Sequence, residues 1–333
     1  DEDLSRGLGD VYKRQRWLSV MEITPKPFGA AISPRATSMK THFTPHDFSE
    51  MTLPESRIYT CVDESRSHAL HFLEGQKLVH DMALMHQLYG SGFAFFRKIC
   101  LTVQPMLCLL KQGEYFGFYL DSDEPYFRLK IELTAGGAIR AMLLPEDFQE
   151  FPEKVSGTMR LNKYSAKSKS PYQSVLEIQN HSLDKISDHI LQNSYQMVGS
   201  VIVSETSDQS ILVLKLPNPE SSEQVDEMEG SMELPPHQVN LYHQMLSKGE
   251  TNAEKIQLLL KENGFDFLAG RDVFFRCNCS HKRMIQNLHL YKQNDPQPLF
   301  DESQTSLSVT CEYCKKEYQI TAEDLNQNPY VVN

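Results

Sequence analysis

The sequence of 333 residues lacks several features that define common protein classes. It contains neither of the glycine-rich phosphate-binding motifs GxxxxGK[ST] and GxGxxG, and it has no HExxH. Nucleotide-driven activity and metalloprotease chemistry therefore have no support. No apolar run is predicted to reach the roughly 18 residues that span a bilayer, and the N-terminus has no hydrophobic signal core. We therefore predict a cytoplasmic protein without a membrane segment.

Positive charge is scarce as well. The chain has 33 Lys and Arg against 44 Asp and Glu, which gives a formal net charge of −11 at pH 7. Proteins that bind nucleic acid over a broad surface need an excess of cationic side chains to replace the counterions of the phosphates. Nucleic acid is therefore not an expected partner.

The N-terminal segment shows no pattern of a folded domain. Residues 1–20 have neither helical nor strand periodicity, and we set them aside as non-native sequence, with Met21 as the start. Residues 22–57 contain five prolines among Ser, Thr and His, a composition typical of an extended arm. We predict a disordered arm over residues 1–54 and a folded domain that begins after it.

Residues 55–216 carry the patterns of an α+β domain with a mostly antiparallel sheet and packed helices. Apolar residues at helical spacing predict a helix over 67–89. Alternation on both sides of a Gly-Gly turn predicts a β-hairpin over 127–144. Ser182 precedes an apolar stripe and predicts the N-cap of an amphipathic helix. Further strands are predicted at 155–161, 172–178, 198–203 and 211–216.

The composition changes abruptly at residues 217–236, which contain six acidic residues and no basic one. The negative charges of such a segment repel one another, and the segment has few apolar side chains that could pack against a folded domain. A short helix is predicted over 239–246, and a capping box formed by Thr251 and Glu254 predicts a second one. We predict a metastable acidic linker with short helices over residues 217–270, which depends on docking for its stability.

The C-terminal segment, residues 271–333, contains a Cys-x-Cys and a Cys-x-x-Cys motif separated by 31 residues. The cysteines are Cys277, Cys279, Cys311 and Cys314. Four thiolates close a tetrahedral zinc site, so we predict one zinc ion per chain in a small C-terminal zinc module. Four protein ligands leave no open coordination position, so the metal is not expected to be catalytic and the chain is not expected to be an enzyme.

Several side chains near the cysteines leave alternatives open. Basic residues there would favour thiolates and offset the charge of the site, or they are ordinary surface charges. These residues are Arg276, Lys282, Arg283, Lys315 and Lys316. His281 could compete as a ligand, but four sulfurs already satisfy zinc, so a surface histidine is favoured. A purely structural metal site, whose only role is to stabilise the module, also remains an alternative. Cys61, Cys100 and Cys108 stand apart and are predicted to be small buried hydrophobes.

The order of these segments resembles the bacterial heat shock protein 33 family, the redox-regulated 33 kDa chaperonins. FRCNCS, and CEYCKKEY followed by TAEDL, are similar to the zinc module of that family. The likeness runs from about Ser56 to Leu325 and is strongest in the last fifty-odd residues. The chain departs from the family pattern at Asn278 and His281 and by its long arm before Pro54.

The resemblance implies an ATP-independent holdase chaperone that binds unfolded or aggregation-prone client proteins with its sheet domain as the core. The reduced form would hold zinc on the four cysteines and be inactive. Oxidation together with unfolding stress would form the disulfides Cys277–Cys279 and Cys311–Cys314 and release zinc. The zinc module and the linker would then unfold, and the active species would be a homodimer.

Two other functions fit parts of the pattern. A zinc-ribbon protein that binds nucleic acid or acts in translation, with a purely structural zinc, would need a basic face with aromatic residues. A thiol oxidoreductase would use Cys311 and Cys314 as a turnover dithiol, but no helix N-terminus follows to lower the thiol pKa. Under the redox hypothesis, Cys311–Cys314 is predicted to oxidise before Cys277–Cys279, because a Cys-x-Cys disulfide is the more strained.

Overall fold

The computed structural model describes residues 52–86, 88, 90–145, 152–165, 170–217, 234–294, 298–300 and 304–326. The predicted arm up to residue 51 and the acidic stretch 218–233 lie outside the described residues. The chain divides into two compact units, and the division falls between Arg276 and Cys277. The sequence had placed the corresponding boundary between residues 270 and 271.

The larger unit contains two β-sheets, five α-helices and one 3₁₀ helix among its described residues. Its strands are β1 (Arg57–Asp63), β2 (His68–Glu74), β3 (Glu114–Glu124), β4 (Tyr126–Thr134), β5 (Ala138–Leu144), β6 (Lys154–Ser165), β7 (Tyr172–Ser182), β8 (Gly199–Val203), β9 (Gln209–Lys215), β10 (Phe265–Asp272) and β11 (Phe274–Phe275). Its helices are α2 (Gln76–His86), α3 (Gly90–Val103), the 3₁₀ helix η2 (Gln104–Leu109), α4 (Leu183–Tyr195), α5 (Pro236–Ser247) and α6 (Ala253–Glu262).

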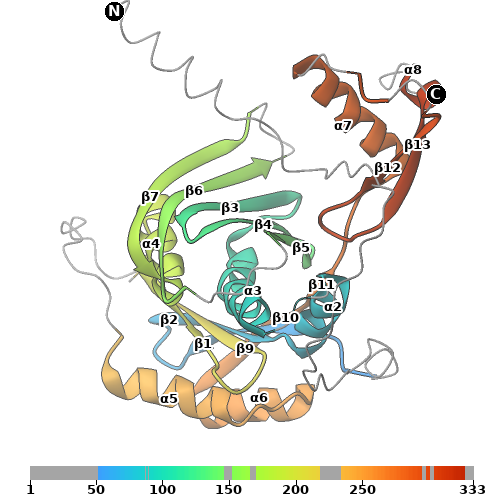
Figure 1. Cartoon of the computed structure of the whole chain (residues 1–333). Helices are drawn as coiled ribbons and strands as arrows, with labels where there is room; N and C mark the ends of the chain where they lie inside the picture. The colour runs from blue at the N-terminus through green and yellow to red at the C-terminus, as the bar shows by residue number, and fades with distance from the viewer. Residues whose placement is uncertain are drawn as a thin grey trace, which may run out of the picture. The chain divides into compact units, whose positions relative to one another are not determined.

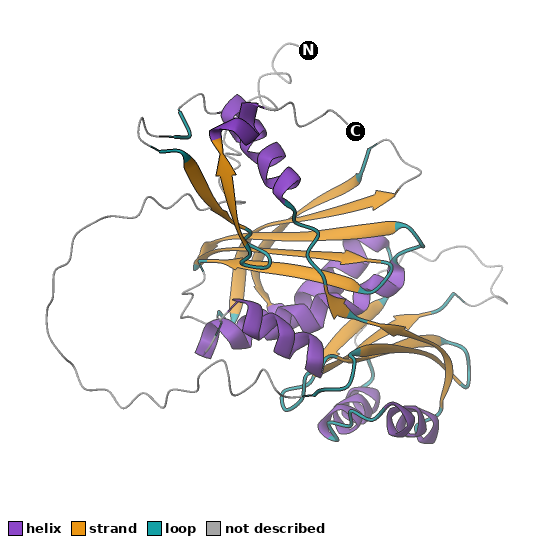
Figure 2. Cartoon of the chain, turned by 90° about the vertical axis from the view of Figure 1, so that its right-hand side faces the viewer, coloured by secondary structure: helices purple, strands orange, loops and turns teal. Residues whose placement is uncertain are grey.

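The two sheets of the larger unit are antiparallel apart from one short pair. The five-stranded sheet has the order β10-β1-β2-β9-β8, and the six-stranded sheet has the order β11-β5-β4-β3-β6-β7, in which only β11 runs parallel to its neighbour. The helices α3 and α4 lie between the sheets, and α5 and α6 cover the other face of the five-stranded sheet (Figures 1 and 2). This arrangement confirms the predicted α+β class.

Two apolar clusters hold these layers together. The first lies between the sheets and joins α2, α3 and α4 to side chains such as Phe118, Leu129 and Val201. The second lies between the five-stranded sheet and the helices α5 and α6, with Phe72 and Leu260 among its members. Because burying one large apolar side chain contributes about 1.5–3 kcal/mol, both clusters bind their helices firmly to the sheets.

The helix predicted over 67–89 was only half right. Its first half is the strand β2, and only its second half is the helix α2. The central strand β2 has apolar clusters on both faces, with Phe72 in the cluster under α5 and α6 and Leu73 in the cluster between the sheets. A strand buried on both faces has a continuous apolar run instead of a strict alternation, so its sequence resembles a buried helix.

The hairpin prediction was correct, since β4 and β5 pair antiparallel with Leu133 opposite Ile139. The helix α3 was missed. With η2 it includes an apolar stretch, Gly92–Leu109, which is long enough to cross a membrane, contrary to the expectation that no such run exists. Two thirds of this stretch is buried inside the structure (67%), as in the core helix of a globular domain.

The region between the acidic stretch and Cys277 contributes one strand to each of the two sheets. Both short helices predicted there are present as α5 and α6, but the N-cap of α6 is Asn252, whose side chain accepts hydrogen bonds from the N–H groups of Glu254 and Lys255. Thr251, the predicted cap, lies one residue earlier. The following strand β10, which was not predicted, pairs with β1, and β11 pairs with β5.

Candidate metal centre

The smaller unit is a compact module around the four cysteines. Its described elements are α7 (His281–Asn294), β12 (Ser306–Thr310), β13 (Glu317–Thr321) and α8 (Ala322–Asn326). The strands form a two-stranded antiparallel sheet. Its buried apolar side chains are Met284, Leu288, Leu307, Val309, Tyr313, Tyr318 and Ile320. The segment between the two cysteine motifs is long enough in sequence for a helix over 284–291 and a strand over 306–310, and the structure contains both, as α7 and β12.

The fold brings the sulfur atoms of Cys277, Cys279, Cys311 and Cys314 within 4.8 Å of one another. The sulfur of Cys277 lies 3.7 Å from that of Cys311, and the sulfur of Cys279 lies 3.3 Å from that of Cys314. Four sulfurs bound to one zinc ion at about 2.3 Å in a tetrahedron would lie roughly 3.8 Å apart. The donor set and its spacing therefore fit a single tetrahedral metal ion.

The second pair of cysteines is held by a tight turn between β12 and β13. The carbonyl of Cys311 accepts hydrogen bonds from the N–H groups of Cys314 at 3.3 Å and Lys315 at 2.7 Å. Lys315 adopts a left-handed backbone conformation with φ of 57°, and the N–H of Cys311 closes the turn onto the carbonyl of Lys316 at 3.0 Å. Backbone N–H groups of the turn also donate to the sulfurs of Cys311 and Cys314, which favours thiolates.

The four thiols cannot all lose their protons easily without a cation. A hydrogen bond from Cys311 lowers the pKa of Cys277, so this residue is the first to become a thiolate. The same hydrogen bond raises the pKa of Cys311, and burial raises the pKa of Cys314 to about 11. A second negative charge within a few ångströms of the first is unfavourable. A bound divalent cation reverses this balance, because a metal-bound thiol is deprotonated outright.

Tyr318 is a neighbour of the cluster that the sequence did not indicate. Its hydroxyl donates a hydrogen bond to the sulfur of Cys279 at 3.1 Å, and this interaction raises the pKa of Tyr318. Such a donor orients a metal ligand and stabilises its negative charge. Tyr318 lies on β13 whereas Cys279 belongs to the first motif, 39 residues earlier. Spacing along the chain therefore gives no signal for this contact.

His281 and Lys315, two further side chains that the sequence placed near the cysteines, interact with groups other than the sulfurs. The ring nitrogen Nε2 of His281 lies 3.1 Å from the carbonyl of Gln319 and 3.7 Å from Asp324, so this histidine is engaged away from the sulfurs. Lys315 forms an ion pair with the buried carboxylate of Glu312 at 3.0 Å. Its charge is therefore largely balanced before it can act on the thiolates.

The remaining cysteines belong to the larger unit. Cys61 and Cys100 are fully buried, and burial raises the pKa of both, that of Cys61 to about 12. Cys108 is only partly buried as a whole residue, but desolvation raises the pKa of its thiol to about 11. Thiols with a raised pKa are poor nucleophiles, which agrees with a packing role.

The fold and the cluster define an α+β protein with a C-terminal module able to hold one metal ion on four cysteines. The family model described as "Hsp33 protein" matches residues 57–321, and the chain belongs to this family of chaperones. The 33 kDa chaperonin of Pelobacter propionicus is 23% identical over 240 residues, which cover 66% of this chain and 76% of that protein. The 33 kDa chaperonin of Geobacter sulfurreducens is 25% identical over 271 residues, covering 75% and 87% respectively.

A solved structure shows the same fold. The 33 kDa chaperonin of Thermotoga maritima superposes with a TM-score of 0.59 and 13% sequence identity, covering 82% of this chain and 97% of that one. The family resemblance noted from the cysteine motifs is thereby confirmed by the family model and by the fold.

Proposed function

We propose that the chain is a redox-regulated, ATP-independent holdase, whose reduced form holds one zinc ion on Cys277, Cys279, Cys311 and Cys314 and is inactive. Oxidation forms the disulfides Cys277–Cys279 and Cys311–Cys314, and the oxidised protein, as a homodimer in the cytoplasm, binds unfolding clients. The observation that carries this proposal is the approach of the four sulfurs to within 4.8 Å, because the same atoms can serve as metal ligands or as disulfide partners.

The chemistry of the switch balances with a peroxide as the oxidant. In each pair, one thiolate attacks the peroxide and the second thiolate attacks the resulting sulfenic acid. One S–S bond forms, the O–O bond breaks, two electrons pass from the sulfurs to the peroxide, and the oxygens leave as water after taking up protons. A zinc ion held by the four cysteines would supply a positive charge that keeps all four sulfurs ionised. Each disulfide would use two of the four sulfurs, so the chain could no longer hold the ion.

Loss of the ligands would unfold the smaller unit first. Its buried apolar side chains are few, and structural zinc contributes folding energy to modules of this kind. The order of oxidation remains as predicted, with the Cys311–Cys314 turn before the Cys277–Cys279 pair, because one residue between two cysteines leaves the disulfide strained. We further propose that α5 and α6, which follow the acidic stretch, detach from the five-stranded sheet less readily than the smaller unit unfolds. Their apolar faces are buried in the cluster that contains Leu260.

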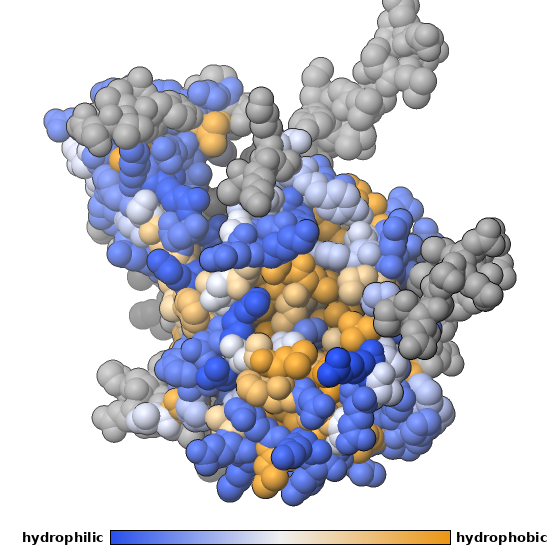
Figure 3. All heavy atoms as spheres, turned by 180° about the vertical axis from the view of Figure 1, so that it is seen from behind, coloured by the Kyte–Doolittle hydropathy of each residue, from blue (hydrophilic) through white to orange (hydrophobic). Residues whose placement is uncertain are grey.

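The larger unit offers surface for client binding. Figure 3 shows apolar side chains gathered in the middle of one face of this unit. Contiguous apolar surface on a protein marks sites of interaction with other proteins or ligands. This surface supports the proposal that the sheet domain is the client-binding core.

Light scattering from a heat-denatured client protein tests the proposal. Reduced, zinc-loaded protein should leave aggregation unchanged, and peroxide-treated protein should suppress it at near-stoichiometric amounts. A Cys311→Ser, Cys314→Ser double variant is expected to lose the peroxide response, whereas a Cys100→Ser variant is expected to keep it, because Cys100 lies in the core of the larger unit. Equal behaviour of the reduced and oxidised wild type would contradict the switch and leave a purely structural zinc.

A further inference from the structure

The turn that carries the second pair of cysteines contains a strained residue. Lys315 directly follows Cys314 and adopts a left-handed backbone conformation with φ of 57°. A residue with a β-carbon is disfavoured in this conformation, which glycine adopts without a steric cost. Backbone strain of this kind persists only where the surrounding structure enforces it, and it is concentrated at functional sites. A lysine at this position therefore indicates a role for its side chain that glycine could not fill.

The ammonium group of Lys315 neutralises a buried carboxylate. Its Nζ lies 3.0 Å from Oε2 of Glu312, whose side chain is only 7% exposed. Burying a carboxylate is costly unless a cation pairs with it. Glu312 directly follows Cys311, just as Lys315 directly follows Cys314. The ion pair therefore joins the residue after the first cysteine of the motif to the residue after the second.

This ion pair lies across the same turn that the backbone closes. The carbonyl of Cys311 accepts hydrogen bonds from the N–H groups of Cys314 and Lys315, and the N–H of Cys311 donates to the carbonyl of Lys316. The sulfurs carried by this turn lie within 4.8 Å of the other two cysteine sulfurs. Because Lys315 is bonded to Cys314, a change in its backbone conformation would move the sulfur of Cys314 relative to that of Cys311.

The first pair of cysteines is held without a buried charge. The guanidinium of Arg283 donates to the carbonyl of Asn278, between the two cysteines, at 3.0 Å. The N–H of Arg283 also donates to the hydroxyl of Ser280 at 3.3 Å, so this motif is anchored to the first turn of α7. The second motif lies between the strands β12 and β13 and has no helix beside it in the chain. It depends on contacts within its own turn.

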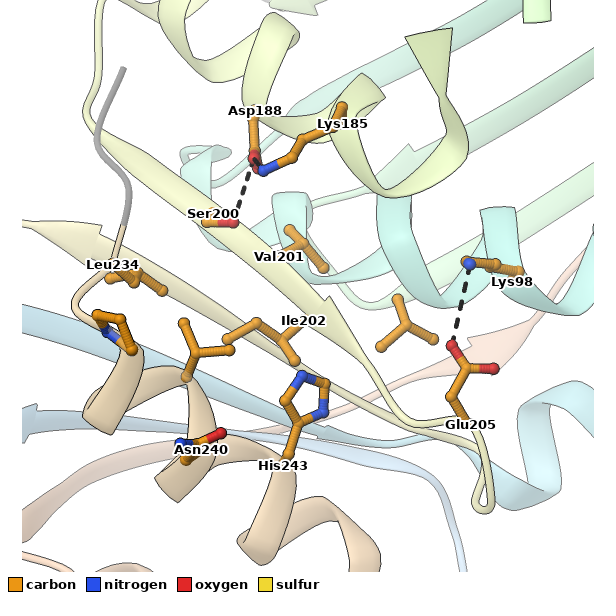
Figure 4. Close-up of a pocket in the computed structure, with 13 residues that line it drawn as sticks. Lys98, Lys185, Asp188, Ser200, Val201, Ile202, Glu205, Leu234, Asn240 and His243 are labelled. Atoms are coloured by element: carbon orange, nitrogen blue, oxygen red, sulfur yellow. Dashed lines mark hydrogen bonds and ion pairs between the residues drawn. The ribbon is translucent and has the colours of Figure 1, made fainter. Parts of the chain in front are cut away.

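Another lysine–carboxylate pair with the same spacing gives a comparison. In α4, Nζ of Lys185 lies 3.4 Å from Asp188, at a cavity of about 530 Å³ (Figure 4). The side chain of Lys185 is 61% exposed, and both residues belong to a regular helix. Exposed helical pairs of this kind contribute little to stability. The side chain of Lys315 is only 23% exposed, and its pair with Glu312 forms on a strained backbone.

We propose that Glu312 and Lys315 are positioning residues of the metal centre, and that their ion pair fixes the Cys311–Cys314 turn so that both sulfurs reach the same metal ion. Neither side chain is a ligand, since the group of described residues able to hold one ion consists of the four cysteines. The ion pair acts only through the shape of the turn. The inference rests on the metal site of the proposed function and adds two residues to it.

The test measures Zn²⁺ affinity of the reduced full-length protein by competition with a chromophoric chelator. Lys315→Met leaves the buried carboxylate of Glu312 without this cation and should weaken binding by more than about ten-fold. Glu312→Gln, which leaves no buried charge, should weaken it by about ten-fold. Lys315→Arg keeps the cation and should stay within about three-fold of the wild type. Wild-type affinity in both Lys315→Met and Glu312→Gln would overturn the inference.

A glycine at this position separates the side chain from the backbone. Lys315→Gly removes the ion pair and also relieves the strain of the left-handed conformation. Under the inference it should bind zinc as weakly as Lys315→Met. Binding as tight as that of the wild type would show that only the backbone matters and would overturn the inference. Lys185→Met, which removes the exposed pair of α4, and Lys292→Met, which removes an exposed charge of α7, are the controls and should leave the affinity unchanged.

Co²⁺ distinguishes positioning from general stabilisation. The visible absorption bands of Co²⁺ bound by four thiolates depend on the geometry of the ligands. In the Co²⁺-loaded protein, Lys315→Met and Glu312→Gln should shift these bands, and Lys315→Arg should show the wild-type spectrum. Weaker metal binding with unchanged bands in both variants would mean that the pair only stabilises the module, and the positioning role would be wrong.

Aggregation assays on the wild type separate this inference from the proposed function. If the metal measurements come out as expected but the oxidised protein does not suppress client aggregation, the positioning role stands and the holdase function is wrong. If the oxidised protein suppresses aggregation but the variants bind metal as the wild type does, the holdase function stands and the positioning role is wrong.

Discussion

The two units of this chain are stabilised in different ways. In the larger unit, two apolar clusters tie helices to both faces of the five-stranded sheet and to the inner face of the six-stranded sheet. In the described part of the smaller unit, one helix, a two-stranded sheet and a very short helix bury only a few apolar side chains beside four clustered sulfurs. Small domains of this kind usually need a metal or disulfides in addition to their core.

If the smaller unit holds a metal, as its four cysteines allow, its stability depends on metal and on oxidation, whereas the stability of the larger unit rests on its apolar clusters. The stability of an apolar core depends on temperature and denaturant, because both change the free energy of burying apolar surface. A cluster of thiolates responds to both metal and peroxide. Under the proposed function, the sensor lies in the unit with the smaller apolar core, so that a chemical signal would change the folding of this unit while the larger unit keeps its structure.

The largest expected effect comes from removing metal. Treatment of the reduced protein with a strong zinc chelator, in the presence of a thiol reductant, should unfold residues 277–326 and leave the larger unit folded. Structural zinc contributes apparent binding free energies of about 10–16 kcal/mol in small modules. Hydrogen exchange measured by mass spectrometry should show loss of protection in α7 and β12. Protection of these elements after the metal is gone would mean that the apolar core of the module is sufficient.

A change in the larger unit should have the complementary effect. Leu129 is fully buried between the sheets, and Leu129→Ala should lower the free energy of unfolding of this unit by about 2–5 kcal/mol. Val175→Ala, at a position 58% exposed, is the matched control and should change it little. Urea unfolding and zinc content are the measurements. Loss of zinc in the Leu129 variant under native conditions would show that the units depend on each other.

The larger unit should also have a pH dependence that the module does not share. Burial raises the pKa of Glu74 from an ordinary value of 4.5 to about 7. The folded form therefore holds this proton more tightly than the unfolded form, so the stability that the protonated group contributes is complete below about pH 4.5 and is lost as the pH rises through about 7.

We expect this group to remove about 2 kcal/mol of stability between pH 5 and 8, at roughly 1.4 kcal/mol per pKa unit with allowance for partial solvation. Glu74→Gln should be more stable than the wild type at pH 8 and should have a flatter profile. Glu177→Gln, at an exposed position of β7, is the control. Parallel profiles for the Glu74 variant and the wild type would contradict the expectation.

A smaller effect should follow from the hydrogen bond to the cluster. Tyr318→Phe removes the hydroxyl that donates to the sulfur of Cys279. Partners of this kind are worth about 10–100-fold in metal affinity, and we expect the lower end because a single neutral donor is lost. Competition with a chromophoric chelator measures the change. Tyr126→Phe in the larger unit should leave the affinity unaltered, and the same affinity in both variants would exclude a role for Tyr318.

Local sequence patterns predicted much of both units. The Gly136–Gly137 turn between two apolar stretches was sufficient to locate the hairpin of β4 and β5, because turn type and alternation are properties of neighbouring residues. The helix α7 and the strand β12 lie in the segment between the two cysteine motifs, which was expected to have room for one helix and one strand. The N-cap of α6 was placed one residue early, because Thr251 and Asn252 are both suitable caps and only the helix geometry selects Asn252.

Elements whose surroundings come from distant parts of the chain were missed or assigned wrongly. The strand β2 was taken for a helix because both of its faces are buried, one in the cluster between the sheets and the other in the cluster with α5 and α6, whose residues, such as Leu260, lie far along the chain. The strand β10 has four consecutive exposed residues, Asp266, Phe267, Leu268 and Ala269, and only its pairing with β1 makes it a strand. Neither feature leaves a periodic pattern in the local sequence.

The sequence by itself determined which sulfur atoms could bind a metal ion in this protein. Two closely spaced cysteine pairs in an acidic chain without phosphate-binding motifs specify a set of sulfur donors, since each short motif brings its own two sulfurs together. The tertiary structure decided how these donors meet and what surrounds them. It placed Tyr318 against Cys279 and engaged His281 elsewhere, because contacts across strands and layers depend on how distant segments pack.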